Sequence, residues 1–310
     1  MHKKGFSPLE SGLGRGSGRS QCRLLTGFTL VELLVVIAVL ALLMALLLPS
    51  LQVAKQHAKS VVCQSNLRQW GTIFRIYTDD HDGRLPRQEF WGLATPNHWM
   101  YTMREHSAGT EGIRCCPMAA KLADPVGQAG TSFGRPDRNV AGGTFLAWGK
   151  FKVQPRDQRF TDFFYGSYGI NNWLAVPEET ASIIIGGPQA SVRPYFWRTT
   201  AITGAGAVPV FLDSWWWCAW VKSTDRPPQY EDEKAGFPCG CRESIQRFCM
   251  NRHRGFVNAI FLDYSVRKVG LKELWTLKWH RNFDTAGSWT KAGGVGPGSW
   301  PKWMRHFKDY

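Results

Sequence analysis

The chain has 310 residues, of which 44% are hydrophobic and 20% charged, and its 15 tryptophans exceed ordinary usage. This composition excludes a disordered chain and suits one or two globular units with buried cores. The formal net charge is +14, but the Lys and Arg residues are scattered beyond the first 27 positions, so we expect a solvated basic surface and no nucleic-acid partner.

Residues 28–48 form the most apolar segment, FTLVELLVVIAVLALLMALLL, with Glu32 as its single charge. As a helix it would span roughly 31 Å, enough to cross a bilayer. Because basic residues of the leader 1–27 precede it, we expect a single-pass inner-membrane protein with a cytoplasmic N-terminus and an extracytoplasmic head. A secretory signal peptide is the alternative, but its apolar region is typically about 7–15 residues long and ends in small residues.

The junction between leader and apolar segment carries a specific motif. Residues 27–33 read GFTLVEL, and Pro49 follows the apolar run. The motif resembles the processing site of type IV pilins and of the pseudopilins of type II secretion. The resemblance implies cleavage by a prepilin peptidase between Gly27 and Phe28, N-methylation of Phe28, and other pilin-like subunits as partners.

Glu32 needs a partner in this setting, because a carboxylate near the bilayer centre costs about 2.5–3.5 kcal/mol and somewhat less near an end. The resemblance implies that Glu32 of one subunit pairs with the N-terminal amine of Phe28 in its neighbour and so sets the stagger of an assembly. The alternative is a glutamate that reaches the membrane interface on its own.

Residues 49–78 continue the helical pattern and predict a stem helix packed on the head. The apolar positions recur at steps of three and four: Val53, His57, Val61, Leu67, Trp70, Phe74 and Tyr77. The acidic turn Asp79, Asp80, Asp82 with Gly83 should end this helix. Its carboxylates are weak calcium candidates, since the full EF-hand loop is absent and a plain acidic turn explains them.

Residues 79–310 predict a β-rich head of short strands between Gly, Pro and Asn turns. We expect strands at Ser182–Ile185 and Val208–Leu212, and a hairpin over Phe256–Val269. The predicted fold class is therefore α+β, a long N-terminal helix whose first half is transmembrane and whose second half packs on this head.

The head adds further resemblance to a large branch of bacterial pilin-like proteins, through CQSNLRQ at 63–69, YGIN at 168–171 and the spacing His253-x9-Asp263. That branch usually places glycine after the aspartate, where this chain has Tyr264, so a positive φ there would be strained. His253 and Asp263 could suggest a catalytic base with its orienting carboxylate. No nucleophile accompanies them, and we expect a histidine hydrogen-bonded to the turn aspartate.

The eight cysteines lack the spacing of a zinc site, because neither Cys115-Cys116 nor Cys239-Gly240-Cys241 matches C-x2-C. The sequence thus predicts no resident metal or other cofactor. In an exported chain disulfides are the usual alternative, and we predict a bridge between Cys63 and Cys116, with Cys115 as the rival partner.

The tryptophans suggest a second candidate function. Trp215, Trp216 and Trp217 could stack on sugar rings if exposed, although core packing and subunit contact together explain them more simply. The sequence therefore predicts a non-enzymatic pilin-like subunit of a secretion or surface filament. The alternative is a surface-displayed glycan-binding module on a pilin-type stem.

Overall fold

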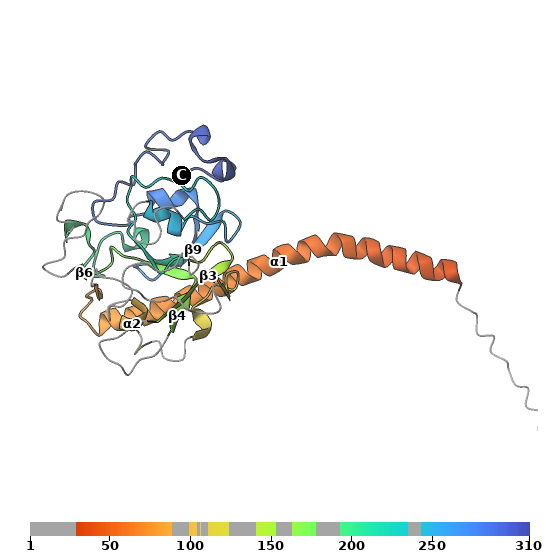
Figure 1. Cartoon of the computed structure of the whole chain (residues 1–310), viewed down its shortest axis with the longest axis horizontal. Helices are drawn as coiled ribbons and strands as arrows, with labels where there is room; N and C mark the ends of the chain where they lie inside the picture. Colours follow the sequence, from red (N-terminus) through yellow and green to blue (C-terminus); the bar gives the residue numbers. More distant parts are fainter. Residues whose placement is uncertain are drawn as a thin grey trace, which may run out of the picture. The chain divides into compact units, whose positions relative to one another are not determined.

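A computed structural model of the chain describes residues 29–88, 99–103, 106, 111–123, 141–152, 163–177, 193–234 and 243–310. The chain divides into two compact units, Met1–Leu51 and the head unit Gln52–Tyr310. The architecture is α+β, with one long N-terminal helix and a globular region of β-sheets (Figure 1). The predicted fold class is confirmed.

Helix α1 runs without a break over Leu30–Asp79 and contains Pro49. Proline lacks the N–H that a helix interior needs, and nearby the Ser50 hydroxyl donates to the Leu47 carbonyl at 2.8 Å. Every residue from 30 to 51 is exposed. Among the residues that the structure describes, α1 is the one helix that is long and apolar enough to cross a membrane.

Within the head unit, one face of α1 lies in the core. Its buried residues are Ser60, Cys63, Asn66, Leu67, Trp70, Gly71, Ile73, Phe74, Tyr77 and Thr78. The predicted positions Leu67, Trp70, Phe74 and Tyr77 are confirmed. His57 and Val61 are wrong, because both are exposed, Val61 at 62%. Val61 stands six residues before Leu67 and so lies about 120° around the helix from that face. Polar Ser60 and Cys63 continue the face instead.

The predicted end of the helix is confirmed. Asp79 is its last residue, and the turn that follows returns to the helix through the Gly83 N–H, which donates to the Thr78 carbonyl at 2.7 Å. Gly83 has φ 72° and Asp82 φ 54°. Glycine accepts the left-handed region at no steric cost, which suits it to this position.

The main sheet has five strands in the order β10-β9-β7-β5-β8. All neighbours are antiparallel except β5 and β8, which are parallel. The strands are β5 (Tyr168–Asn171), β7 (Pro209–Asp213), β8 (Cys218–Ala219), β9 (Phe256–Phe261) and β10 (Val266–Gly270). The predicted strand at 208–212 and the C-terminal hairpin are therefore confirmed, whereas Ser182–Ile185 lies outside the described residues.

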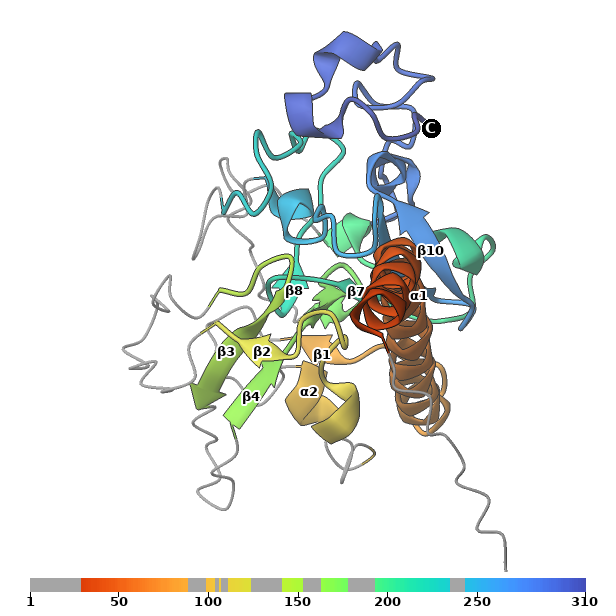
Figure 2. The ribbon, with the colours of Figure 1, turned by 90° about the vertical axis from the view of Figure 1, so that its right-hand side faces the viewer.

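Smaller elements surround this sheet. Figure 2 shows β2 (Lys121–Leu122), β3 (Leu146–Lys152) and β4 (Phe163–Gly166) side by side as a second sheet. Strands β1 (Arg87–Gln88) and β6 (Val176–Pro177) form a parallel pair. The short helices are α2 (Trp99–Thr102), η2 (Glu111–Ile113), η4 (Arg193–Tyr195), η5 (Ala205–Ala207), η6 (Ser244–Arg247), η7 (Lys272–Thr276), η8 (Pro297–Ser299) and η9 (Lys302–Met304).

Tryptophan fills much of the head core. Fully buried indoles include Trp70, Trp148, Trp215, Trp275, Trp279 and Trp300. All of these indole N–H groups except that of Trp300 donate to backbone carbonyls, as in Trp70 to the Ile113 oxygen at 3.0 Å and Trp275 to the Asp225 oxygen at 2.8 Å. Core packing therefore accounts for much of the unusual tryptophan content.

The C-terminal hairpin fixes the second half of α1. Gly71 lies so close to β9 that an added Cβ would overlap Cδ1 of Ile260. At the hairpin turn Tyr264 has φ 65°, the strained conformation expected where the related pattern has glycine. The Tyr264 hydroxyl lies 3.2 Å from the Thr78 hydroxyl, so this tyrosine gains a contact with α1 that glycine could not make.

Candidate functional site

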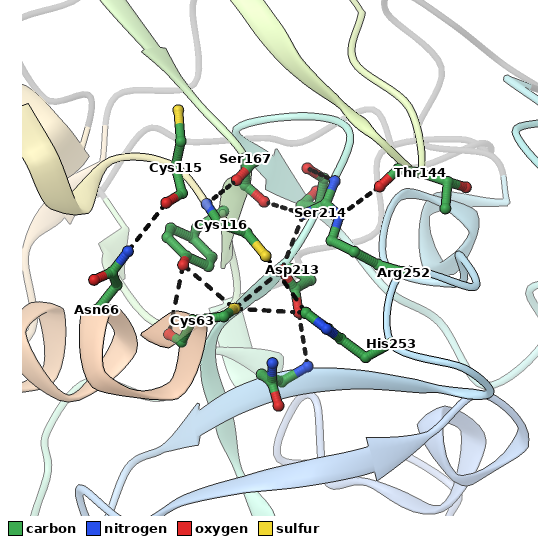
Figure 3. Close-up of polar contacts among 12 residues, drawn as sticks. Cys63, Asn66, Cys115, Cys116, Thr144, Ser167, Asp213, Ser214, Arg252 and His253 are labelled. Carbon is green, nitrogen blue, oxygen red and sulfur yellow. Dashed lines mark hydrogen bonds and ion pairs between the residues drawn. The ribbon is translucent and has the colours of Figure 1, made fainter. Parts of the chain in front are cut away.

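Four side chains that can bind metals or react meet in the interior of the head unit. Cys63 lies on α1, Cys116 follows η2, Asp213 ends β7 and His253 precedes β9. The exposed fraction is 0% for the first three and 6% for His253. Their ligand atoms all lie within 4.8 Å of one another (Figure 3). Four separate segments of chain thus converge on one point.

Direct contacts link the four groups in the order Cys63, Asp213, His253 and Cys116. The Cys63 thiol donates to Asp213 Oδ1 at 3.5 Å, and Cys116 Sγ lies 3.4 Å from His253 Nε2. His253 Nε2 in turn lies 3.1 Å from Asp213 Oδ2. The Tyr168 hydroxyl donates to Cys63 Sγ at 3.3 Å.

Strand pairing brings Asp213 to this place. Residue 213 pairs with Tyr168 across β5 and β7, and the Asn258 backbone N–H on β9 donates to Asp213 Oδ2 at 2.8 Å. Close packing on β5 requires Gly169, because an added Cβ would meet the Trp216 carbonyl oxygen at 2.5 Å. Strand β5 thus places Tyr168 beside the cluster, next to Cys63.

Arg252 places a buried positive charge beside the cluster, and its side chain is 0% exposed. Its guanidinium binds Asp213 Oδ1 at 3.0 Å through Nη1. The same fork donates to the carbonyls of Thr144, Ser167 and Gly143 at 2.7, 2.7 and 2.9 Å. A planar guanidinium suits this many acceptors in fixed positions, which an ammonium does not.

The charges in the cluster depend on one another. Burial favours the neutral carboxyl, but His253 and Arg252 outweigh that effect and hold the pKa of Asp213 well below its usual range. Burial would lower the pKa of His253, yet the charge and hydrogen bond of Asp213 raise it to about 9. Burial raises the pKa of Cys63 far above its ordinary value. The pKa of Cys116 falls to about 7, because hydrogen bonds from Cys63 and His253 offset burial.

No family model, curated protein or solved structure matches the chain. The chemistry of the cluster therefore follows from its own atoms. The Sγ atoms of Cys63 and Cys116 lie within 4.8 Å of each other. The two thiols can be oxidised to a disulfide if their sulfurs move closer together, or they can act as thiolate ligands together with imidazole and carboxylate.

The structure places the predicted disulfide partners together as free thiols. Cys63 and Cys116 are both buried and unbridged, as are Cys218 and Cys249, while Cys115 is a half-buried free thiol. The predicted bridge is thus absent from the structure. Cys115 takes part through its backbone instead, because its carbonyl accepts from the Asn66 side chain at 3.0 Å.

The predicted pairing of His253 with Asp263 is wrong. His253 binds Asp213, whereas Asp263 is exposed and accepts from the Ser265 N–H at 3.0 Å within the hairpin turn. The error has a physical cause: His253 and Asp263 flank the same strand, but the register of β9 on β7 places His253 against the end of β7. The sequence did not lead us to predict Asp213 or Arg252 as site residues. The position of Asp213 at the end of the apolar strand β7 was a signal that could have indicated it.

The tryptophans proposed for ligand stacking are mostly interior. Trp215 and Trp216 are 1% and 2% exposed, and Trp217 is half-buried. The Trp215 indole donates to the Gln246 carbonyl at 2.9 Å. Trp215 and Trp216 therefore cannot offer a stacking face, and the expectation of a ligand site formed by all three is wrong.

The acidic turn does not gather its carboxylates. Asp79 pairs with Arg75 at 3.5 Å, and Asp80 lies 3.9 Å from His106. Within the part of the chain that the structure describes, close groups of three or more metal-binding side chains occur only at the buried cluster. Asp79, Asp80 and Asp82 are thus not arranged as a calcium site.

The predicted processing site lies just before Thr29, the first residue that the structure describes. Gly27 and Phe28 are outside the described residues, and α1 begins two residues later. Glu32 is exposed and accepts from the backbone N–H and hydroxyl of Thr29 at 2.9 and 2.7 Å. This contact forms a local cap at the first turn of the helix.

Proposed function

We propose that the chain is a pilin-like subunit, anchored in the inner membrane by the apolar half of α1. A prepilin peptidase would remove the leader by cutting between Gly27 and Phe28. The extracytoplasmic head would then take its place in a secretion or surface filament with other pilin-like subunits. The proposal includes no enzymatic activity.

The continuity of α1 is the observation that supports this proposal. One helix contains both a fully exposed apolar stretch, residues 30–51, and a buried face that begins at Ser60. A solvent-exposed surface of this kind is unfavourable in water and is expected where lipid or other subunits cover it. A signal peptide, in contrast, is removed after its apolar region and has no reason to share a helix with the folded core.

Glu32 supports the same function by its position. It is an exposed carboxylate among exposed leucines and valines near the start of α1. Its contact with Thr29 leaves its charge uncompensated. The N-terminal amine that cleavage would create on Phe28 of a neighbouring subunit is the cation we propose for it.

The test is the N-terminus of the mature protein. The full chain, extracted from membranes, should begin at Phe28 with one added methyl group by mass spectrometry. Gly27→Ala should slow or stop cleavage, because the peptidase subsite before the cut accepts only the smallest residue. Gly18→Ala, the same change within the leader, is the matched control and should be processed normally.

A mature protein that retains Met1, or that begins after Pro49, would overturn the proposed processing. Topology has its own readout. A protease added to intact spheroplasts should digest the head of a correctly inserted chain. Full protection of the head would contradict an extracytoplasmic location.

A further inference from the structure

We propose that Cys63, Cys116, Asp213 and His253 together bind one Zn²⁺ ion in the core of the head unit. The four residues come from four segments and are nearly fully buried. Nothing in their spacing along the sequence resembles a zinc motif. The inference rests on where the fold brings their donor atoms.

The distances between the donor atoms suit a tetrahedral ion. With metal–ligand distances of about 2.0–2.3 Å, neighbouring ligand atoms in a tetrahedron lie roughly 3.3–3.8 Å apart. With Asp213 Oδ2 as the carboxylate ligand, the Cys63–Asp213 distance of 3.7 Å and the Cys116–His253 distance of 3.4 Å fall in this range. The His253–Asp213 contact of 3.1 Å is only slightly shorter. Three of the six edges of the donor tetrahedron thus have nearly the lengths of a zinc coordination sphere, and all the donor atoms lie within 4.8 Å of one another.

The donor types favour zinc over other common ions. Two thiolates exclude magnesium and calcium, which prefer oxygen ligands, while thiolate with imidazole in four-coordinate geometry is typical of Zn²⁺. Four protein ligands leave no open position for a reacting water. The proposed ion is accordingly structural and consistent with a non-enzymatic head.

The formal charges balance when the ion is present. Two thiolates and the Asp213 carboxylate supply three negative charges, while Zn²⁺ and Arg252 supply three positive ones, with His253 neutral. A buried site of zero net charge avoids the large penalty of an uncompensated ion in the interior. Arg252, which is fully buried beside the cluster, thus has a partner for its charge in the metal-bound state.

Neighbouring groups hold the ligands in place. The Arg252 guanidinium and the Asn258 backbone N–H fix the Asp213 carboxylate at 3.0 and 2.8 Å. The Tyr168 hydroxyl at 3.3 Å can donate to a Cys63 thiolate. Hydrogen bonds of this kind orient metal ligands and are part of most metal sites.

A pocket adjoins the cluster. A pocket of about 270 Å³ is lined by His253 and Arg252 together with His57, Asn251 and Phe256, among others. His253 is thus the ligand that lies nearest to solvent.

A disulfide between Cys63 and Cys116 is the competing state. Forming it would remove two protons and two electrons from the thiols and would consume both sulfur ligands. Zinc and disulfide are therefore mutually exclusive at this site, so one experiment can distinguish them.

The experiment uses the full chain in detergent, purified without chelator. Elemental analysis should give about one zinc per chain, and Cys116→Ala should reduce it at least tenfold. Cys249→Ala is the matched control, because Cys249 is equally buried but its sulfur contacts Met304 at 4.0 Å, outside the cluster. This control should keep its zinc.

A second measurement does not depend on a variant that folds. Stripping the wild-type chain with a zinc chelator should lower its Tm by at least about 10 °C, and ZnCl2 should restore it. Refilling with CoCl2 should give thiolate-to-cobalt charge-transfer absorption and the intense visible bands of tetrahedral Co²⁺. Less than a tenth of a zinc per folded wild-type chain, or a Cys63–Cys116 disulfide in the peptide map of exported protein, would overturn the proposal.

Discussion

Replacing Arg252 should be among the most damaging single changes in the head unit. Its guanidinium donates to the carbonyls of Gly143 and Thr144 and to that of Ser167, which lies between β4 and β5. It also binds the Asp213 carboxylate at the end of β7. Arg252→Met keeps much of the aliphatic volume and removes every one of these donors. The carbonyls of Gly143 and Thr144 would then lose the donor that binds them, and Asp213 would lose its arginine while keeping His253 and the Asn258 N–H.

The expected loss can be worked out from these contacts. Removing one partner of a buried ion pair costs about 3–5 kcal/mol, and here the carbonyls left without a donor add to the loss while His253 still compensates part of the Asp213 charge. For a domain of this size each kcal/mol lowers Tm by roughly 2–4 °C, so Arg252→Met should lower Tm by about 6–20 °C. Arg252→Lys should recover less than half of this loss, since one ammonium cannot reach acceptors on both sides of the fork.

Thermal unfolding of the detergent-solubilised chain, followed by circular dichroism, measures these differences. Arg68→Met makes the same chemical change on the exposed face of α1 and should alter stability by no more than about 0.5 kcal/mol. If Arg252→Met matched Arg68→Met, or if Arg252→Lys were as stable as the wild type, the fork would not hold these segments together.

Three further predictions concern other parts of the chain. Glu32→Leu should preserve membrane insertion but abolish incorporation into filaments, as measured by co-purification with partner subunits. Gly71→Ala should destabilise the head by about 1–3 kcal/mol, despite alanine's better helix propensity, because the new Cβ overlaps Ile260; Ile260→Val in the same chain should recover part of the loss in urea unfolding. Burial raises the pKa of Asp225 to about 7 from its ordinary value of 3.8, so the contribution of the neutral carboxyl to stability is full below pH 4 and is lost as the pH rises through 7. Asp225→Asn should therefore be more stable than the wild type at pH 8, by up to about 4 kcal/mol, with little difference at pH 4.

Each of these has an outcome that would contradict it. Assembly of Glu32→Leu at wild-type levels would show that no charge pair is needed. An additive loss in the Gly71→Ala, Ile260→Val double variant would place the two residues out of contact. Equal pH profiles for Asp225→Asn and the wild type would mean that the carboxyl titrates normally in the fold, where Glu243 and Lys222 exert opposite effects on it.

Hydrophobic patterns along the sequence were enough to predict the long helix, part of its buried face and the C-terminal hairpin. The apolar run predicted the first half of α1, the spacing of Leu67, Trp70 and Phe74 predicted its buried face, and alternation predicted the β9–β10 hairpin. The prediction that Val61 is buried failed because an apolar residue at helical spacing can belong to a second, exposed stripe of the helix. Nothing in the sequence distinguishes that stripe from the buried one. Only packing decides which stripe is buried.

The cluster could not be predicted in the same way. Its four donors stand singly in the sequence, and Cys116 and His253 are 137 residues apart. The pairing of His253 depends on how β9 registers with β7, which is a tertiary property. The local H-x9-D spacing therefore pointed to Asp263, while the partner came from a strand end far away in the chain.

Asp213 and His253 are synthesised long after the two cysteines of the cluster, and this order has a consequence for biosynthesis. Cys63 and Asp213 are separated by 150 residues, which takes roughly 8–30 s to synthesise at about 5–20 residues per second. During that interval Cys63, and Cys116 once it has been synthesised, have no folded core to shield them. In a chain exported as proposed, oxidants of the envelope would meet both thiols before Asp213 and His253 arrive. The redox state of the finished core would then depend on the speed of delivery as well as on its final contacts.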